Sequence, residues 1–152
     1  MKSAALPISG FEPAMLALNP HPIADPRRRV LVVDDDPAMA RAIQRVLCRA
    51  GYETVSAGDG LVARSLVYGY KPALVTLDLA MPHVDGAALT TLLCELRQAT
   101  PSLACRLLVL SGAPQDELEQ ALALGADDVL PKPFLNEDLL ARVERLLAAC
   151  PR

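Results

Sequence analysis

The stretch Val30-Leu31-Val32-Val33-Asp34-Asp35-Asp36-Pro37 decides the fold, because within it a buried strand passes directly into a helix. Consecutive aliphatic residues are typical of a strand that is covered on both faces of its sheet. Asp36 then fits the N-cap of a helix, and Pro37 fits the first helical position. A strand followed at once by a helix is the first half of a βαβ unit, the building block of parallel sheets.

The same alternation continues to the end of the chain. The pattern predicts strands at 30–34, 53–57, 73–77, 106–110 and 128–130, and helices at 37–50, 59–69, 86–99, 114–124 and 136–149. Gly51 and Gly125 are expected to end helices, and the helical spacing predicts that Val62 and Leu122 face the core. We therefore predict an α/β, flavodoxin-like, five-stranded parallel sheet with strand order 2-1-3-4-5 and helices on both faces.

Length and charge restrict the classes of protein to be considered. The 152 residues suggest one domain with a short extension, and the net charge of −3 gives no general basic field for nucleic acid, so we expect this domain to bind none directly. No apolar run reaches the length of a membrane span, and Pro7 and Pro13 interrupt the segment where a signal peptide would lie. The expected location is the cytoplasm, where the four cysteines would stay reduced.

Residues 1–28 differ from the rest and form a Pro-rich N-terminal extension, which we expect to be flexible on its own; residues 29–150 form the domain. The extension ends in Arg27-Arg28-Arg29. A solvated charge run is the favoured interpretation of these arginines, and a small anion-binding patch is the alternative.

Acids and other polar residues stand where the predicted strands end. Asp34 and Asp35 follow the first strand, Asp78 follows the third, Ser111 the fourth and Lys132 the fifth. In the predicted topology the carboxyl ends of the first and third strands border the switch point, where ligands bind. Clustered carboxylates suit a hard cation such as Mg²⁺, and no Gly-rich phosphate loop is present for a nucleotide. These parts are typical of phosphoryl transfer.

The acids differ in the roles that their positions favour. Asp78 stands alone at the end of the central strand, so we predict that it is the phosphoacceptor. Asp34 and Asp35 are adjacent and better suited to hold metal, whereas Asp36 is interpreted as a helix cap.

Four motifs carry a family resemblance. They are Val32–Pro37, Leu77–Gly86, Leu110-Ser111-Gly112 and Pro131-Lys132-Pro133-Phe134. In order and spacing they resemble the receiver domain of two-component response regulators, and the match covers about residues 29–149.

The resemblance implies a role for each matched residue. Asp78 would accept a phosphoryl group from a phosphohistidine of a histidine kinase or a histidine phosphotransfer protein. Asp34, Asp35, Asp78 and the backbone carbonyl of Ala80 would hold Mg²⁺. No enzymatic activity is implied beyond the domain's own phosphorylation and slow dephosphorylation.

Further roles follow from the same resemblance. Ser111 and Lys132 would contact the phosphoryl oxygens, and the Lys132-Pro133 peptide is expected to be cis. Val129 stands where the family has its switch aromatic, so we expect the signal to pass through backbone shifts of residues 111–116 instead. Small Ala80 and Ala113 flank the acceptor, and this predicts slow self-dephosphorylation.

Several alternatives concern the whole protein. We expect a stand-alone receiver that changes the binding of a downstream protein partner; an N-terminal fragment of a DNA-binding response regulator is the alternative. A haloacid dehalogenase-type phosphatase, suggested by Asp34-x-Asp36, lacks the acid pair expected after the lysine. An interaction module that is never phosphorylated is also considered. The helix 114–124, strand 128–130 and helix 136–149 face is a candidate homodimer surface.

Overall fold

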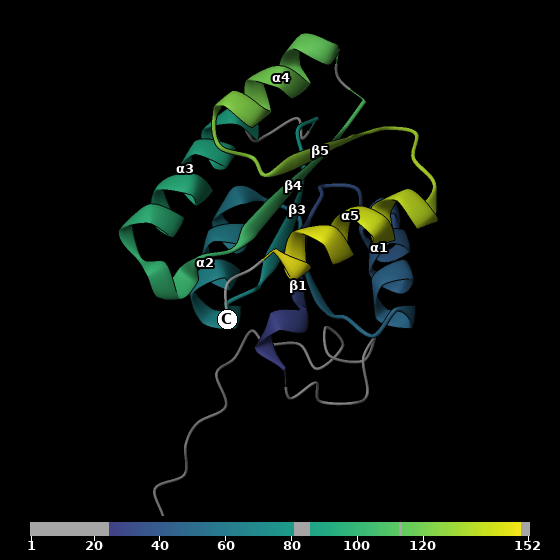
Figure 1. The fold of residues 1–152 in the computed structure, drawn as a ribbon, viewed down its shortest axis with the longest axis horizontal. Coiled ribbons are helices and arrows are strands. Elements are labelled where there is room, and N and C mark those ends of the chain that lie inside the picture. Colours follow the sequence, from purple (N-terminus) through teal and green to yellow (C-terminus); the bar gives the residue numbers. More distant parts are fainter. Residues whose placement is uncertain (1–24, 81–85, 113, 150–152) are drawn as a thin grey trace, which may run out of the picture.

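The computed structural model describes residues 25–80, 86–112 and 114–149 (Figure 1). Its strands are β1 (Arg29–Val33), β2 (Glu53–Ala57), β3 (Leu74–Asp78), β4 (Arg106–Ser111) and β5 (Asp128–Pro131). Its α-helices are α1 (Pro37–Arg49), α2 (Gly60–Tyr70), α3 (Gly86–Ala99), α4 (Gln115–Ala123) and α5 (Asn136–Ala148). Short 3₁₀ helices lie at Pro26–Arg28 (η2) and Pro101–Leu103 (η3). Each α-helix and strand therefore begins and ends within one residue of its predicted bounds.

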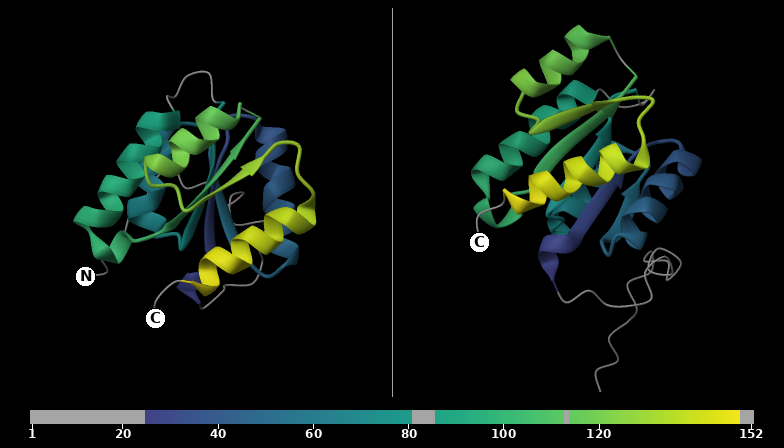
Figure 2. Two further views of the ribbon diagram at one scale, coloured as in Figure 1. Left: turned by 45° about the horizontal axis from the view of Figure 1, so that its top comes forward. Right: turned by 45° about the vertical axis from the view of Figure 1, so that its right-hand side comes forward.

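The five strands form one parallel sheet in the order β2-β1-β3-β4-β5, which confirms the predicted topology. Figures 1 and 2 show α1 and α5 on one face of this sheet and α2, α3 and α4 on the other. Two helical layers are expected because each parallel connection crosses over a face of the sheet in the right-handed sense.

Four of the five strands, β1, β3, β4 and β5, supply residues to both hydrophobic cores, whereas β2 supplies Val55 and Ala57 to the core under α2, α3 and α4. Val30 and Val32 of β1 pack toward α1 and α5, whereas Leu31 and Val33 pack toward α2, α3 and α4. Successive strand residues point to opposite faces, so a sheet covered on both sides needs apolar residues at every position. This explains why β1 and β4 appear in the sequence as continuous apolar runs, whereas the edge strand β2 alternates with the polar residues Thr54 and Ser56.

The helices begin and end at the residues that the sequence predicted as caps and stops. The Asp36 side chain accepts a hydrogen bond from the Ala38 N–H, 2.9 Å away, and Pro37 opens α1. Gly51 and Gly125 have φ values of +89° and +117°, in the left-handed region that favours glycine. The predicted cap and both predicted helix stops are confirmed.

Two predicted core positions are wrong. Val62 and Leu122 are 41% and 43% exposed. In each case an adjacent alanine, Ala63 or Ala121, is the buried residue. Adjacent positions on a helix differ by about 100° in direction, so a small residue can face the sheet while its larger neighbour faces outward. Helical spacing favoured Val62 over its neighbour Ala63, and on the later helix it assigned Leu122 to the core together with Ala121.

The arginine run is solvated only in part: Arg27 is exposed and pairs with Asp25, whereas Arg28 and Arg29 bind the ends of two helices. Arg28 donates hydrogen bonds to the carbonyls of Ala50 and Gly51, at 3.0 and 2.9 Å, and lies over the Tyr52 ring. A cation that binds the last carbonyls of α1 interacts favourably with the helix dipole. Arg29 donates to the Tyr70 carbonyl at the end of α2. These contacts attach the amino end of β1 to two helices.

Some predictions fall outside the described residues. These are the extension over residues 1–24, the part of the family motif at 81–85, Ala113 and Cys150. No helix among the described residues is long and apolar enough to cross a membrane.

Candidate functional site

The residues singled out in the sequence meet at one edge of the sheet. Asp34 follows β1, Asp78 ends β3, Ser111 ends β4 and Lys132 follows β5. These four strands are consecutive neighbours in the sheet. Because the sheet is parallel, all four side chains start from its carboxyl edge, which the topology predicts to be the ligand-binding edge.

Asp34 and Asp78 are held in the same local geometry. One oxygen of Asp34 accepts the Asp36 N–H at 2.9 Å, and one oxygen of Asp78 accepts the Ala80 N–H at 2.9 Å. This hydrogen bond to the residue two positions on is an Asx-type turn, and it orients each carboxylate. The side chains are nearly buried, because Asp34 and Asp78 are only 4% and 6% exposed.

The acids outnumber the nearby cation. Asp34, Asp35 and Asp78 each offer a carboxylate oxygen, and these oxygens all lie within 4.8 Å of one another. Lys132 Nζ lies 3.3 Å from Asp78 Oδ2 and 4.0 Å from Asp34 Oδ2. One ammonium therefore serves two buried carboxylates, and the exposed Asp35 carboxylate lies beside them, so negative charge is left over at this edge.

Asp34 bears the main cost of this arrangement. Its burial raises the carboxyl pKa above its usual value, and the Asp78 charge raises the pKa further, whereas the Asp36 N–H and Lys132 lower it. Among the described residues, Asp34 Oδ2 finds no hydrogen-bond partner although it is buried. An unpartnered buried oxygen beside two further carboxylates suits a hard cation, and Mg²⁺ fits this donor set. The Ala80 carbonyl stays a predicted ligand.

The other end of the site is formed by β4 and β5. Ser111 is completely buried, and its carbonyl accepts the Lys132 N–H at 2.8 Å. The Lys132-Pro133 peptide is cis, as predicted. These contacts place the lysine side chain next to the carboxylates. Val129, at the position expected for an aromatic, is half-buried against the core that α2, α3 and α4 cover.

An apolar groove begins at the same lysine. Its volume is about 400 Å³, and it lies between α1 and the start of α5. It is lined by Met39, Ala42, Ile43, Val46, Lys132, Pro133, Phe134, Asn136 and Leu139. The apolar side of α1 borders this groove through Met39, Ala42, Ile43 and Val46.

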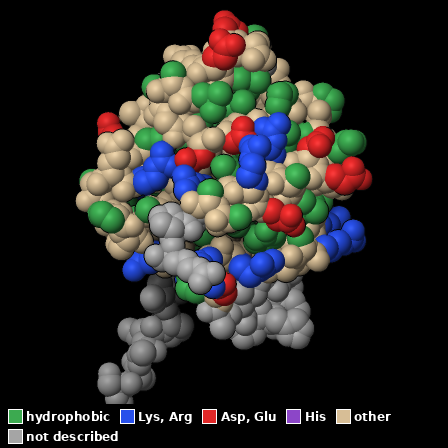
Figure 3. Space-filling model, in the orientation of Figure 1, with side chains coloured by type: hydrophobic (Ala, Val, Ile, Leu, Met, Phe, Trp, Pro, Cys, Tyr) green, Lys and Arg blue, Asp and Glu red, His purple; other side chains and the backbone are tan. Residues whose placement is uncertain are grey.

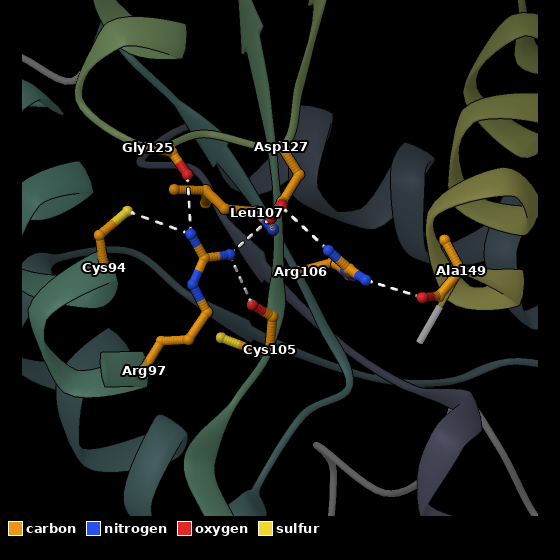
Figure 4. A network of polar contacts seen from close by, with 8 residues as sticks. All are labelled: Cys94, Arg97, Cys105, Arg106, Leu107, Gly125, Asp127 and Ala149. Carbon is orange, nitrogen blue, oxygen red and sulfur yellow. Dashed lines mark hydrogen bonds and ion pairs between the residues drawn. The ribbon is translucent and has the colours of Figure 1, made fainter. Parts of the chain in front are cut away.

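Sequence reasoning missed a second polar cluster, shown in Figure 4. Asp127 accepts hydrogen bonds from Arg97 at 2.7 Å and from the Leu107 N–H at 2.8 Å, and it lies 3.3 Å from Arg106. Arg97 and Arg106 also donate to the carbonyls of Gly125 and Ala149, both at 2.8 Å. The cluster lies at the amino ends of β4 and β5 and ties them to α3 and α5. Its only signal in the sequence was an acid directly before a strand.

The chain matches the family model for the response regulator receiver domain over residues 30–144. It is 39% identical over 126 residues to the DNA-binding dual master transcriptional regulator RpaA of Synechocystis sp., covering 82% of this chain and 51% of RpaA. It is also 39% identical over 119 residues to the response regulator MprA of a Mycobacterium species, covering 78% of this chain and 50% of MprA. The chain thus spans about half the length of these curated relatives.

Solved structures agree. The signal receiver domain of a response regulator from Bermanella marisrubri is 43% identical, with a TM-score of 0.72 over 79% of this chain and 98% of that one. A response regulator protein from Burkholderia pseudomallei with a phosphorylated aspartic acid, calcium ion and citrate is 32% identical, with a TM-score of 0.68 over 80% of this chain and 71% of that one. The chain therefore belongs to the response regulator receiver domain family.

Proposed function

We propose that Asp78 accepts a phosphoryl group and that the domain changes its binding to a partner as a result. The carrying observation is the Asp78 carboxylate, which the Ala80 N–H orients and which Lys132 Nζ approaches to 3.3 Å. The relative from Burkholderia pseudomallei, which is described with a phosphorylated aspartic acid, supports the same chemistry here.

In the proposed step, a carboxylate oxygen of Asp78 attacks the phosphorus atom of a phosphohistidine. An O–P bond forms and the P–N bond breaks, and the leaving ring keeps the bonding electron pair and takes a proton from solvent to become neutral imidazole. Lys132 and the Ser111 hydroxyl are suited to contact the phosphoryl oxygens, where negative charge must be stabilised. The product is an acyl phosphate on Asp78.

Magnesium fits the acidic end of the site. Asp34, Asp35 and Asp78 would hold the ion, and the Ala80 carbonyl is a further proposed ligand. A bound Mg²⁺ supplies positive charge that neutralises the phosphoryl oxygens. The buried Asp34 oxygen that has no hydrogen bond would become a metal ligand. This favours Mg²⁺ binding even before a phosphoryl donor is bound.

The groove between α1 and α5 suits the donor protein, a histidine kinase or a histidine phosphotransfer protein. Its lining is mostly apolar, and it reaches Lys132 and so adjoins the phosphoryl site. For the output, binding of a downstream protein partner is the first proposal. Control of DNA binding in a longer protein is the second, since RpaA is DNA-binding and this chain spans about half its length.

We further propose that the phosphorylated state is long-lived and that the domain catalyses no other reaction. The Ala80 methyl group is exposed beside the acceptor and has no polar atom with which to orient an attacking water. Val129 removes the usual aromatic switch, so the signal would pass through the backbone between Ser111 and α4.

The test is incubation of the chain with Mg²⁺ and a small acyl-phosphate donor, followed by intact mass measurement. We expect the wild type to gain about 80 Da, the mass of one phosphoryl group. The variant Asp78→Asn should gain nothing, because it lacks the nucleophilic oxygen. A wild type that stays unlabelled at saturating donor and Mg²⁺ would overturn the proposal.

Asp36→Asn is the matched control. It changes an acid of the same cluster, but asparagine caps helices as well as aspartate does, so labelling should continue. Chelation of Mg²⁺ should prevent labelling of the wild type. The adduct should then persist for many minutes, whereas loss within seconds would contradict the long-lived state. Continuous turnover of a generic phosphate ester would instead favour a phosphatase.

A further inference from the structure

Helix α2 carries apolar side chains on its outer face as well as on its core face. Ala63, Leu66 and Val67 are buried against the sheet. On the outer side, Leu61, Val62 and Tyr68 are 80%, 41% and 43% exposed. These are three of the five large hydrophobic side chains that are exposed among the described residues. A helix that is apolar all round is usually covered on both sides.

A groove lies next to the most exposed of these residues. Its volume is about 520 Å³, and it runs between the start of α2 and the neighbouring helix α3. It is lined by Asp59, Gly60, Leu61, Arg64, Ala88, Leu89 and Leu92. A protruding leucine and an apolar groove thus occupy the same face of the molecule, which we call the α2–α3 face. Figures 1 and 2 show these two helices side by side.

The charges on the α2–α3 face are also self-complementary. Arg64 is the one charged residue in the sequence of α2, and Asp59 caps the helix by accepting the Val62 N–H at 2.8 Å through one oxygen. Both residues line the groove. In a two-fold contact the same patch faces itself, so Asp59 of one copy meets Arg64 of the other twice.

We propose that two copies of this chain associate through the α2–α3 face, with Leu61 of each copy in the groove of the other. The contact buries apolar surface that is otherwise in water and pairs the Asp59 and Arg64 charges. The proposed dimer forms and dissociates with protein concentration.

The face formed by α4, β5 and α5 offers less for such a contact. Asp128 accepts a hydrogen bond from Arg142 at 3.0 Å and is also paired with Arg145, so these charges are matched within one chain. Figure 3 shows acidic and basic side chains interspersed on the side of the molecule that carries β5 and α5. A second copy would have to compete with these internal pairs, whereas the α2–α3 face offers Leu61, which at 80% is the most exposed large hydrophobic side chain of the described residues.

The test is sedimentation velocity of the full chain without phosphoryl donor, over a wide range of protein concentration. The wild type should shift from monomer to dimer as concentration rises. Leu61→Asp should stay monomeric, with a dissociation constant raised at least about tenfold, because it puts a charge into an apolar groove. Arg64→Glu should also stay monomeric, because the new glutamate would repel Asp59 of the other copy. Asp59→Asn should weaken the dimer less, and asparagine keeps the helix cap.

Leu122→Asp is the control, because Leu122 is an exposed leucine on a different helix, α4, at 43% against the 80% of Leu61. It should dimerise like the wild type. Circular dichroism of each variant checks that the helices remain. A wild type that stays monomeric throughout would overturn the proposal, as would a dimer that persists in Leu61→Asp. Loss of the dimer in Leu122→Asp alone would place the contact on the α4–β5–α5 face instead.

Discussion

The two ends of the sheet use the same residue types in opposite balance. At the carboxyl edge, the buried Asp34 and Asp78 share one lysine, and Asp35 is a third carboxylate beside them. At the amino edge, Asp127 alone is shared by Arg97 and Arg106. The second cluster has its hydrogen bonds made, including two to backbone carbonyls, whereas in the described part of the chain one buried oxygen of Asp34 has no hydrogen bond and only the Lys132 ammonium 4.0 Å away.

The difference in charge balance distinguishes a cluster that stabilises the fold from a cluster that is suited to bind a ligand. A carboxylate with two arginines stabilises the fold, since its charge is compensated where it is formed. A cluster of carboxylates with surplus negative charge lowers the stability of the fold. Such clusters are typical of sites that bind a cation or another ligand, here the proposed Mg²⁺ and phosphoryl group. The presence of acids does not by itself distinguish the two clusters. The number of cationic side chains that contact each acid does distinguish them.

The largest expected effect is loss of the compensated cluster. Asp127→Ala leaves Arg97, Arg106 and the Leu107 N–H without their acceptor. We expect the free energy of unfolding to fall by about 2 kcal/mol, less than for a fully buried pair because both arginines are partly exposed. Urea denaturation measures it, with the exposed Glu95→Gln as control. A change as small as that of the control would mean that the cluster adds nothing to stability.

The next largest effect is expected at the acidic cluster of the carboxyl edge. Mg²⁺ should stabilise the wild type by about 1.4 kcal/mol when its free concentration is tenfold above the dissociation constant. Asp34→Asn should lose most of this gain, because it removes a proposed ligand. Thermal unfolding with and without Mg²⁺ is the measurement. Equal stabilisation of both proteins would place the ion elsewhere.

Without metal, the same substitution should act in the opposite direction from Asp127→Ala. Asp34→Asn should stabilise the fold by about 1 kcal/mol at neutral pH by removing a buried like charge. The raised pKa of Asp34 means that the folded chain binds its proton before the unfolded chain does, so the wild type gains stability as pH falls through that pKa. The advantage of the variant should therefore shrink on acidification, and an advantage that grows would refute this account.

The smallest effect is expected at an exposed pair. Arg145 bonds Asp128, but its side chain is 65% exposed. Arg145→Ala should change the free energy of unfolding by less than about 0.5 kcal/mol. Arg142→Ala provides the comparison, since Arg142 is half as exposed, at 33%, and also donates to the Val129 carbonyl. If Arg145→Ala cost more than Arg142→Ala, exposure would not govern these pairs.

Much of the fold and of the candidate site followed from local patterns. Apolar runs ending in acid predicted strands whose carboxyl ends meet, because parallel connectivity brings those ends to one edge whatever the packing details. Asp34, Asp78, Ser111 and Lys132 are indeed at that edge. The cap at Asp36 was predictable because its hydrogen bond is local and joins residues only two positions apart.

Other features depended on packing that no local pattern contains. Val62 and Leu122 face outward because Ala63 and Ala121 let their helices approach the sheet. Arg28 binds carbonyls 22 and 23 residues away at the end of α1.

The sequence by itself determined the order of the strands and which acids stand at their carboxyl ends, because connectivity and periodicity act over a few residues. Only the tertiary structure decided how the charges are matched. Asp127 meets Arg97, 30 positions away, through the rotation of α3 about its axis, and Asp34 is left with surplus charge through its burial. The same folding left Leu61 on the surface beside a groove. Charge balance and exposure are properties of neighbours in space, and those are set only when helices dock on the sheet.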